Sequence, residues 1–467
     1  MTTVNRLSRR RFLRQLGAMG AVGGLGSAAG ALGLLDLSRL AAAAEPPGGY
    51  QAMVCIFLFG GNDSYNCVIP SDAAGYDTYA LARRGLAVPQ AALLPLTDPA
   101  HADPLGRSFG LNPAMAALHG VFETERRLAV TLNVGPLLYP LTKAQYRNGS
   151  VPHPPGLESH SDQQFQTQSA GILTQDAGYT GWHGRVADVL TGADGALSNF
   201  TNISLAGDNA LQVGQTVLPY AMDHGGTLDL PLSRHVGSAM QERLRSGVER
   251  LLYASPHVLA TAYGQIKERA LAGNAVLAQA LADTTPPTGF PDSDLGRQLQ
   301  TVAQVMAVAP TLGIGRQTFF CSMGGFDTHS DQNDSQPRLL QTLAESMAAF
   351  YRHTQAAGLA ERVTTFTASE FARTFAMNGS QGTDHAWGGI QFVLGGGVQG
   401  GLYGTMPDQT LNGPDDVGGQ GRFIPTTAID QVAATLALWF GVSPGDLAYV
   451  TPNSGRFAAA DLGFMGG

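Results

Sequence analysis

The chain has 467 residues, a formal net charge of −8 and three cysteines. This acidic balance argues against binding to nucleic acid through bulk charge, and so few cysteines exclude a disulfide framework. With 60 glycines and 14% charged residues, the composition indicates a compact, loop-rich protein and not a disordered one.

Residues 1–44 have the pattern of an export signal. Paired arginines followed by Phe12 and Leu13 precede an uncharged stretch over residues 16–35, and three alanines stand just before Glu45. A basic start, an apolar middle and a small-residue exit predict cleavage before Glu45. The arginine pair resembles the twin-arginine signal, which exports folded proteins.

We therefore predict a periplasmic or secreted protein that depends on the twin-arginine export machinery and has no stable membrane span after cleavage. An uncleaved membrane anchor is the alternative. Cleavage would remove six arginines and one aspartate, which shifts the formal charge to about −13. A domain this acidic suits neither nucleic acid nor an anionic membrane surface as a partner.

Apolar runs that end in glycine or polar residues predict buried strands over residues 51–59, 127–134, 202–206, 316–322, 363–368 and 390–394. Helical spacing of apolar residues predicts helices over residues 158–173, 238–283, 294–307 and 336–357. This alternation is typical of an α/β fold with a largely parallel central sheet and helices on both faces. We predict a single domain over residues 45–467, with a helical excursion near residues 230–300.

Two of the three cysteines lie in the predicted strands. Cys55 and Cys321 both stand in apolar runs, so buried free thiols are the first expectation. A bridge between Cys55 and Cys67 is the alternative.

Carboxylates and histidines follow three of the predicted strands or their connecting loops. Because parallel strands bring their carboxyl ends to one edge of a sheet, these groups can meet although they are far apart in sequence. Oxygen and imidazole donors of this kind bind divalent metal ions. The candidate ligands are Asp63, Asp327, His329, Glu370, Asp384 and His385.

Each candidate also has a structural explanation. Asp63 follows two glycines and an asparagine, where it could hydrogen-bond its own turn. Glu370 could pair with Arg373 three residues later, and His385 could pack beside Trp387 in a loop. Convergence of the whole set is what favours a metal site.

A nucleophile is harder to assign. The segment 158–162 opens a predicted helix, and Ser159 or Ser161 could serve there either as a helix N-cap or as a catalytic hydroxyl. The positive helix end would favour a phosphate-like anion. The chain has no Gly-x-Ser-x-Gly elbow, no phosphate-binding Gly-x-x-x-x-Gly-Lys loop and no His-Glu-x-x-His pair.

Several motifs together resemble domain-of-unknown-function family 1501, whose members are exported bacterial proteins of the alkaline-phosphatase-like superfamily. They are Phe57-Leu-Phe-Gly-Gly-Asn-Asp-Ser-Tyr-Asn66, Ser159-His160, Thr180-Gly-Trp-His-Gly-Arg185, Gly324-Gly-Phe-Asp-Thr-His329, Ser369-Glu-Phe-Ala-Arg-Thr374 and Gly382-Thr-Asp-His-Ala-Trp-Gly-Gly389. The resemblance implies an alkaline-phosphatase-like fold and a site for two metal ions.

The resemblance also implies roles for individual residues. Asp63 matches the first aspartate of the superfamily, and Ser159 matches its serine or threonine nucleophile. Asp327, His329 and His385 match later aspartate and histidine ligands. The chain departs from the pattern at two points: Asp327 and His329 are only one residue apart, and Phe371 follows Glu370 where the superfamily has a histidine.

The leading hypothesis is an exported metal-dependent hydrolase of phosphate or sulfate esters. Ser159 and its neighbour His160 are the candidate catalytic residues, and the six strand-end groups hold a divalent metal ion, which is zinc, manganese, calcium or magnesium. The partner is then a small-molecule ester or anionic substrate. The alternative is a non-catalytic, exported binding or scaffold protein on the same fold.

Overall fold

The computed structural model describes residues 49–171, 178–191, 200–224, 243, 246–247, 273–282 and 284–466. The predicted export signal therefore lies outside the described residues, as does most of the predicted helix over residues 238–283. The described residues of that helix, 243, 246–247 and 273–282, are helical. Within the ranges given above, no helix combines the length and the apolar character that a membrane crossing requires.

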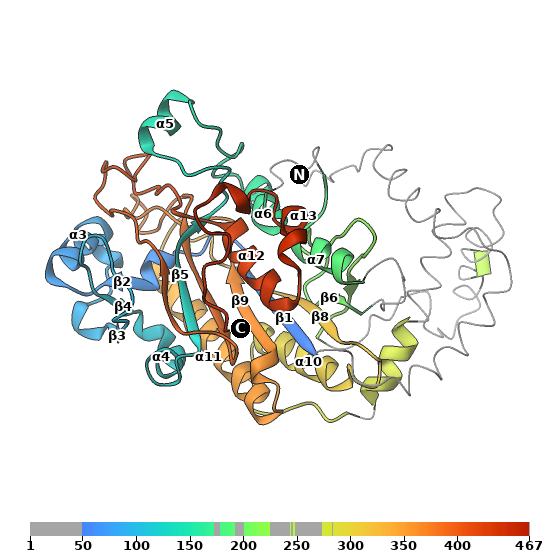
Figure 1. Ribbon diagram of the computed structural model, residues 1–467. Helices are drawn as coiled ribbons and strands as arrows, with labels where there is room; N and C mark the ends of the chain where they lie inside the picture. The colour runs from blue at the N-terminus through green and yellow to red at the C-terminus, as the bar shows by residue number, and fades with distance from the viewer. Residues whose placement is uncertain are drawn as a thin grey trace.

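A mixed, mostly parallel sheet forms the centre of the molecule (Figure 1). Its strand order is β11-β5-β10-β9-β1-β8-β6-β7, and a short strand β12 also pairs with β5. Only β10 runs opposite to both of its neighbours; the other pairs along the sheet are parallel. The strands are β1 Gln51–Leu58, β5 Leu128–Gly135, β6 Asn202–Ser204, β7 Tyr220–Ala221, β8 Arg316–Met323, β9 Val363–Ala368, β10 Gly389–Gly395, β11 Gly401–Gly404 and β12 Thr427–Ala428.

Strand β1 lies inside the sheet, between β8 and β9. Seven of its eight residues are buried, because side chains on both faces of the strand enter hydrophobic clusters. Ala52, Val54 and Ile56 belong to the cluster on one face, whereas Met53 and Cys55 belong to the cluster on the other. A strand covered on both faces explains the nearly continuous apolar run in the sequence.

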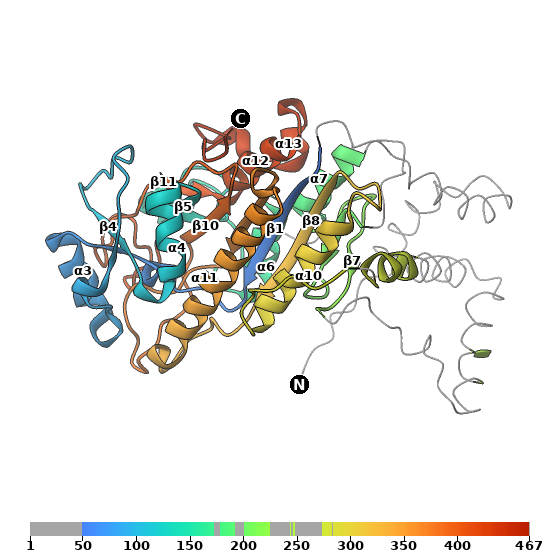
Figure 2. The ribbon, with the colours of Figure 1, turned by 90° about the horizontal axis from the view of Figure 1, so that it is seen from below.

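Helices cover both faces of the sheet (Figure 2). Helices α4, α10 and α11 pack on one face, and α7, α12 and α13 pack on the other. The helices of the main body are α3 Ala73–Arg83, α4 Ala116–Gly120, α5 Lys143–Asn148, α6 His160–Ser169, α7 Trp182–Thr191, α10 Asp294–Val308, α11 Gln332–Ala356, α12 Ile429–Phe440 and α13 Leu447–Val450. The predicted α/β class is therefore confirmed.

All six strands predicted from apolar runs are present, with no end shifted by more than two residues. The prediction missed the short strands β7, β11 and β12, and it missed a separate three-stranded sheet of β2 Val68–Pro70, β4 Phe109–Leu111 and β3 Leu94–Leu96. Segments of two to four residues are too short to show a periodic pattern. Cys55, Cys67 and Cys321 are free and buried, as first expected, and the alternative bridge is not formed.

Candidate metal centre

The carboxyl ends of β1, β8 and β9 meet at one edge of the sheet, which we call the site edge. The antiparallel strand β10 begins at this same edge, because it runs opposite to β9. The loop over residues 369–388 leaves β9 and enters β10, so it stays at the site edge throughout. Asp384 and His385 therefore reach the site although they precede their strand, whereas Asp327 and Glu370 follow theirs.

The loop after β8 alternates buried and exposed side chains. Phe326 and Thr328 are buried, whereas the residue that follows each of them, Asp327 and His329, is exposed. This alternation places the carboxylate and the imidazole on the same side of the loop. The loop lies against the turn after β1, where a Cβ atom on Gly60 would come within 2.3 Å of the Asp327 nitrogen, so this position requires glycine.

Helix α6 contributes His160, its first residue. His160 and Gln164 are four residues apart and lie on the same face of the helix. Both contact the buried carboxylate of Glu370: His160 Nδ1 lies 2.9 Å from Oε1, and Gln164 Nε2 donates to the same oxygen at 3.2 Å. Helix α6 is thereby joined to the end of β9.

Four donor groups converge at the site edge. The His329 and His385 Nε2 atoms lie 3.0 Å apart, and they lie 3.0 Å and 3.2 Å from Asp327 Oδ1. His160 Nε2 lies 3.5 Å from the other oxygen, Asp327 Oδ2. The four side chains are between 22% and 47% exposed, so this cluster opens to solvent.

Each of the three imidazole rings turns its Nδ1 atom toward an oxygen atom of the protein. The pairs are His160 Nδ1 with Glu370 Oε1 at 2.9 Å, His329 Nδ1 with Asp384 Oδ1 at 3.2 Å, and His385 Nδ1 with the Glu158 carbonyl oxygen at 2.8 Å. Carbonyl and carboxylate oxygens accept hydrogen bonds, so a neutral ring carries its proton on Nδ1. Its Nε2 lone pair is then directed at the cluster.

A positive charge at the centre of this arrangement would be favourable. Two imidazole nitrogens at 3.0 Å cannot both donate a hydrogen bond, and a carboxylate faces both of them. His160, Asp327 and His385 offer ligand atoms that all lie within 4.8 Å of one another and could hold a metal ion, and His329 Nε2 lies 3.0 Å from Asp327 Oδ1 as a further possible donor. Two ligands of a tetrahedral zinc ion with bonds of about 2.0–2.1 Å lie about 3.3 Å apart, close to the observed separations. Histidines that bind metal usually donate their other N–H to a carboxylate or carbonyl, as these rings do. The residues therefore fit a divalent metal ion.

The electrostatics of the cluster favour an ionised Asp327 carboxylate and a neutral His385 ring. Burial acts to raise the pKa of Asp327, but the hydrogen bond and charge of Arg373, at 2.5 Å, hold this pKa below its usual value. Burial lowers the pKa of His385, and the charge of Arg373 adds to this effect. In Asp384, hydrogen bonds from Asn378 and His329 outweigh burial and lower the pKa.

The structure brings together six of the eight candidate site residues: His160, Asp327, His329, Glu370, Asp384 and His385. Of these, Glu370 and Asp384 lie behind histidines and not at the centre. His160, predicted as a catalytic residue, instead faces Asp327 with its Nε2 atom.

Asp63 is not part of the cluster. Both of its oxygens are bound by Arg83, at 2.7 Å each, and Gln332 donates to one of them at 2.6 Å. The side chains of Asp63 and Arg83 are fully buried. Asp63 thus forms a buried ion pair. Its contacts differ from both predictions, the metal-ligand role and the side-chain hydrogen bond to its own turn.

Ser159 occupies the N-cap position of α6, but its hydroxyl makes no capping hydrogen bond. The Oγ atom instead lies 3.3 Å from Ser161 Oγ. The capping alternative is therefore not observed for Ser159, and its hydroxyl has no described contact with the four converging groups.

Two contributors to the site were not predicted from the sequence. Arg373 binds Asp327 and the Gly60 carbonyl oxygen, and not Glu370 as the sequence spacing had allowed. Glu158 has a left-handed φ of 70°, which side-chain-bearing residues rarely adopt, and its carbonyl accepts the bond from His385. Arg373 lies within the motif Ser369–Thr374, one of those that carry the family resemblance, and this motif was the available signal. The role of a backbone carbonyl leaves no signal in the sequence.

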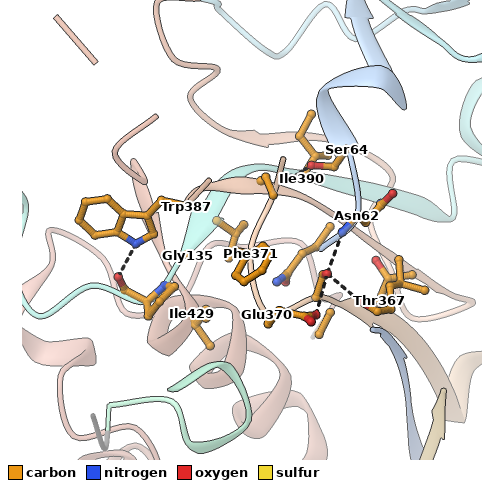
Figure 3. A pocket seen from close by; sticks show the side chains of 17 residues that line it. Asn62, Ser64, Gly135, Thr367, Glu370, Phe371, Trp387, Ile390 and Ile429 are labelled. Carbon is orange, nitrogen blue, oxygen red and sulfur yellow. Dashed lines mark hydrogen bonds between the residues drawn. The ribbon is translucent and has the colours of Figure 1, made fainter. Parts of the chain in front are cut away.

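A small cavity lies beside the cluster, between the ends of β1, β5 and β9 and the start of β10. Figure 3 shows Glu370 and Phe371 in its wall, with Asn62 and Trp387 also lining it. Its volume of about 20 Å³ is enough for a water molecule but not for an ester substrate. A substrate would therefore approach the four converging groups from their solvent side.

The fold and the site together define an α/β protein with a mostly parallel sheet and a three-histidine, one-aspartate cluster at the site edge. Residues 262–429 match the family model described as "Protein of unknown function (DUF1501)", the family that the sequence motifs resemble. The matched segment includes Asp327, His329 and His385. No curated protein matches the chain.

Proposed function

We propose that this protein is an exported, divalent-metal-dependent hydrolase of phosphate or sulfate esters. The observation that carries the proposal is the convergence of three Nε2 atoms on one carboxylate, with each ring oriented from behind by an oxygen acceptor. His160, Asp327 and His385 would hold one metal ion, and His329, 3.0 Å from Asp327 Oδ1, is a further candidate ligand. Imidazole-rich sites favour zinc over calcium or magnesium.

The bound ion would supply Lewis-acid polarisation of an ester oxygen. The chain's own residues would then orient the substrate and supply the nucleophile. Ser159 stands at the positive end of α6, beside His160, and its hydroxyl is not consumed by capping. It is our candidate nucleophile, since a hydroxyl at a helix N-terminus suits attack on an anionic ester.

The test compares the purified protein with Asp327→Ala and Ser159→Ala variants. Wild-type protein should contain about one divalent ion per chain by elemental analysis, and it should hydrolyse at least one phosphate or sulfate ester from a panel. Asp327→Ala should lose both metal and turnover, because a ligand is gone. Ser159→Ala should keep its metal and lose at least about 100-fold in turnover, the scale of a missing catalytic group.

Equal turnover in all three proteins would remove the enzymatic assignment. Turnover that is lost in Asp327→Ala but kept in Ser159→Ala would leave the metal site and remove Ser159 as nucleophile. The exposed variant Asp292→Ala, which removes a carboxylate from a 97% exposed position, controls for the loss of one negative charge.

A second candidate function is metal-dependent binding without catalysis, in an exported scaffold protein. It is favoured by the arginines of the site, which are already engaged: Arg373 by Asp327, and Arg422 by Glu158 and the His385 carbonyl. An ester anion would have to compete for them. Stoichiometric metal without turnover on any ester of the panel would support this candidate.

We further propose export through the twin-arginine pathway, supported by the arginine pair and the alanine exit of residues 1–44. Replacing Arg9 and Arg10 together with lysine should abolish export in a bacterial host, because this pathway reads the arginine pair. Cell fractionation measures the result. Unchanged export of the double variant would exclude this pathway.

A further inference from the structure

The carboxylate of Glu370 is buried at the site edge with an unusual set of partners. Its Oε1 atom accepts from the Gly60 backbone nitrogen at 2.8 Å, from Gln164 Nε2 at 3.2 Å and from His160 Nδ1 at 2.9 Å. The Glu370 side chain is fully buried. The backbone N–H and the Gln164 amide are neutral donors, so the imidazole ring is the one donor of the three that can be positively charged.

We infer that Glu370 is a positioning residue that makes His160 a metal ligand, a role that rests on the proposed metal site. Besides His160, Glu370 accepts from Gly60, in the turn after β1, and from Gln164, on α6. These two contacts fix the position of the carboxylate. The carboxylate therefore holds the His160 ring in one rotation. It also keeps the proton on Nδ1, which leaves Nε2 free toward Asp327.

The charge of Glu370 supplies a second contribution. A buried carboxylate without a cationic partner is unfavourable, and it becomes favourable when positive charge is placed nearby. Each ion pair formed by Glu370 among the described residues involves His160. A cation bound to His160 Nε2 would be attracted to the Glu370 carboxylate on the other side of the ring. The negative charge of Glu370 should therefore raise the affinity for metal without stabilising the metal-free protein.

The substitution Glu370→Gln separates this role from a purely structural one. An amide oxygen can still accept from Gly60, Gln164 and His160, and the new amide group can donate to Ser369 Oγ, which lies 3.3 Å from Oε2. We expect the metal-free variant to unfold at the same urea concentration as metal-free wild type or at a higher one. Its affinity for Co²⁺ or Zn²⁺ should fall about 10–100-fold, the usual effect of losing a partner behind a ligand.

Titration with Co²⁺, followed by visible absorption, measures both the affinity and a spectrum that reports the ligands of the ion. Glu361→Gln is the matched control, because Glu361 is 68% exposed and distant in the fold from the site edge. A double-mutant cycle adds His160→Ala. If Glu370 acts through His160, the loss of affinity caused by Glu370→Gln should be at least fivefold smaller when His160 is absent.

The outcomes are distinct. Wild-type protein that binds no metal would overturn the proposed function and this role with it. Wild-type protein that binds metal, with Glu370→Gln equal to it in affinity and spectrum, would overturn only the role of Glu370. An equal loss of affinity with and without His160 would show that Glu370 does not act through that ring.

Discussion

Replacing Asp63 with alanine should lower the free energy of unfolding by about 3–5 kcal/mol, the effect of removing one partner from a buried ion pair. Arg83 is completely buried, and both of its terminal nitrogens donate to Asp63 at 2.7 Å. The guanidinium also lies over the Phe375 ring, 5.0 Å from its centroid, where little water can replace the lost carboxylate. Urea denaturation of metal-free protein measures the change.

The double variant Asp63→Leu with Arg83→Met should recover most of this loss, because apolar side chains of similar volume can replace a buried pair. Asp292→Ala, which removes a partner from an exposed pair with Arg297, should change stability by less than about 1 kcal/mol. A loss for Asp63→Ala as small as that of Asp292→Ala would contradict the structural role.

The same variant also decides between two roles for Asp63. The family resemblance implied that this residue is a metal ligand, whereas its contacts make it the partner of Arg83. If the contacts describe its role, folded Asp63→Ala protein should bind about as much metal per chain as wild type. Loss of metal without loss of stability would restore the ligand role.

The sequence predicted the strands well because burial on both faces requires apolar side chains at every position. The run over residues 51–59 shows this in β1, where the seven residues after Gln51 are buried. Convergence at the strand ends could also be predicted, since parallel strands share one edge. Asp327, Glu370 and His385 do lie close together at this edge.

Other features depend on tertiary contacts that leave no local pattern. Asp63 and Arg83 are twenty residues apart, and nothing near either residue indicates that the end of α3 returns to the turn after β1. The sequence also does not show which carboxylates face the centre of the site and which accept a hydrogen bond from a histidine ring. Glu370 and Asp384 have the same chemistry as Asp327, and only ring orientation places them behind His160 and His329.

The direction of β10 is a further example. Its apolar run predicts a strand but not its orientation, and a parallel β10 would have carried Asp384 and His385 to the opposite edge of the sheet. The antiparallel pairing is what keeps the loop over residues 369–388 at the site. Within that loop, backbone hydrogen bonds join Ala372 to Trp387 and to Ala386 and hold the histidine in place.

A second large effect should come from His183, in the motif Thr180–Arg185. This side chain is completely buried on α7, and neither ring nitrogen has a hydrogen-bond partner among the residues that the structure describes. Its ring packs against Trp182 and Phe366. Burial lowers the pKa of His183 from 6.5 to about 3, since protonation would place a charge in an apolar environment.

The sign of the pH effect follows from this shift. The unfolded chain takes up a proton near pH 6.5, whereas the folded protein does so only near pH 3. The contribution of neutral His183 is therefore fully present above pH 6.5 and is lost as the pH falls toward 3. At about 1.4 kcal/mol for each pH unit, wild-type protein should lose about 3 kcal/mol from this residue between pH 7 and pH 4.

His183→Leu should abolish this contribution, because leucine has a similar volume and does not titrate. At pH 7 the variant should be at least as stable as wild type, since replacement removes two buried polar atoms without partners. Urea denaturation at pH 7, 5.5 and 4 should thus give curves that diverge as the pH falls, with the variant the more stable. His119→Leu, at a partly exposed position, controls for the loss of a histidine. Parallel pH profiles for His183→Leu and wild type would mean that the ring gains a proton or a partner in the folded protein.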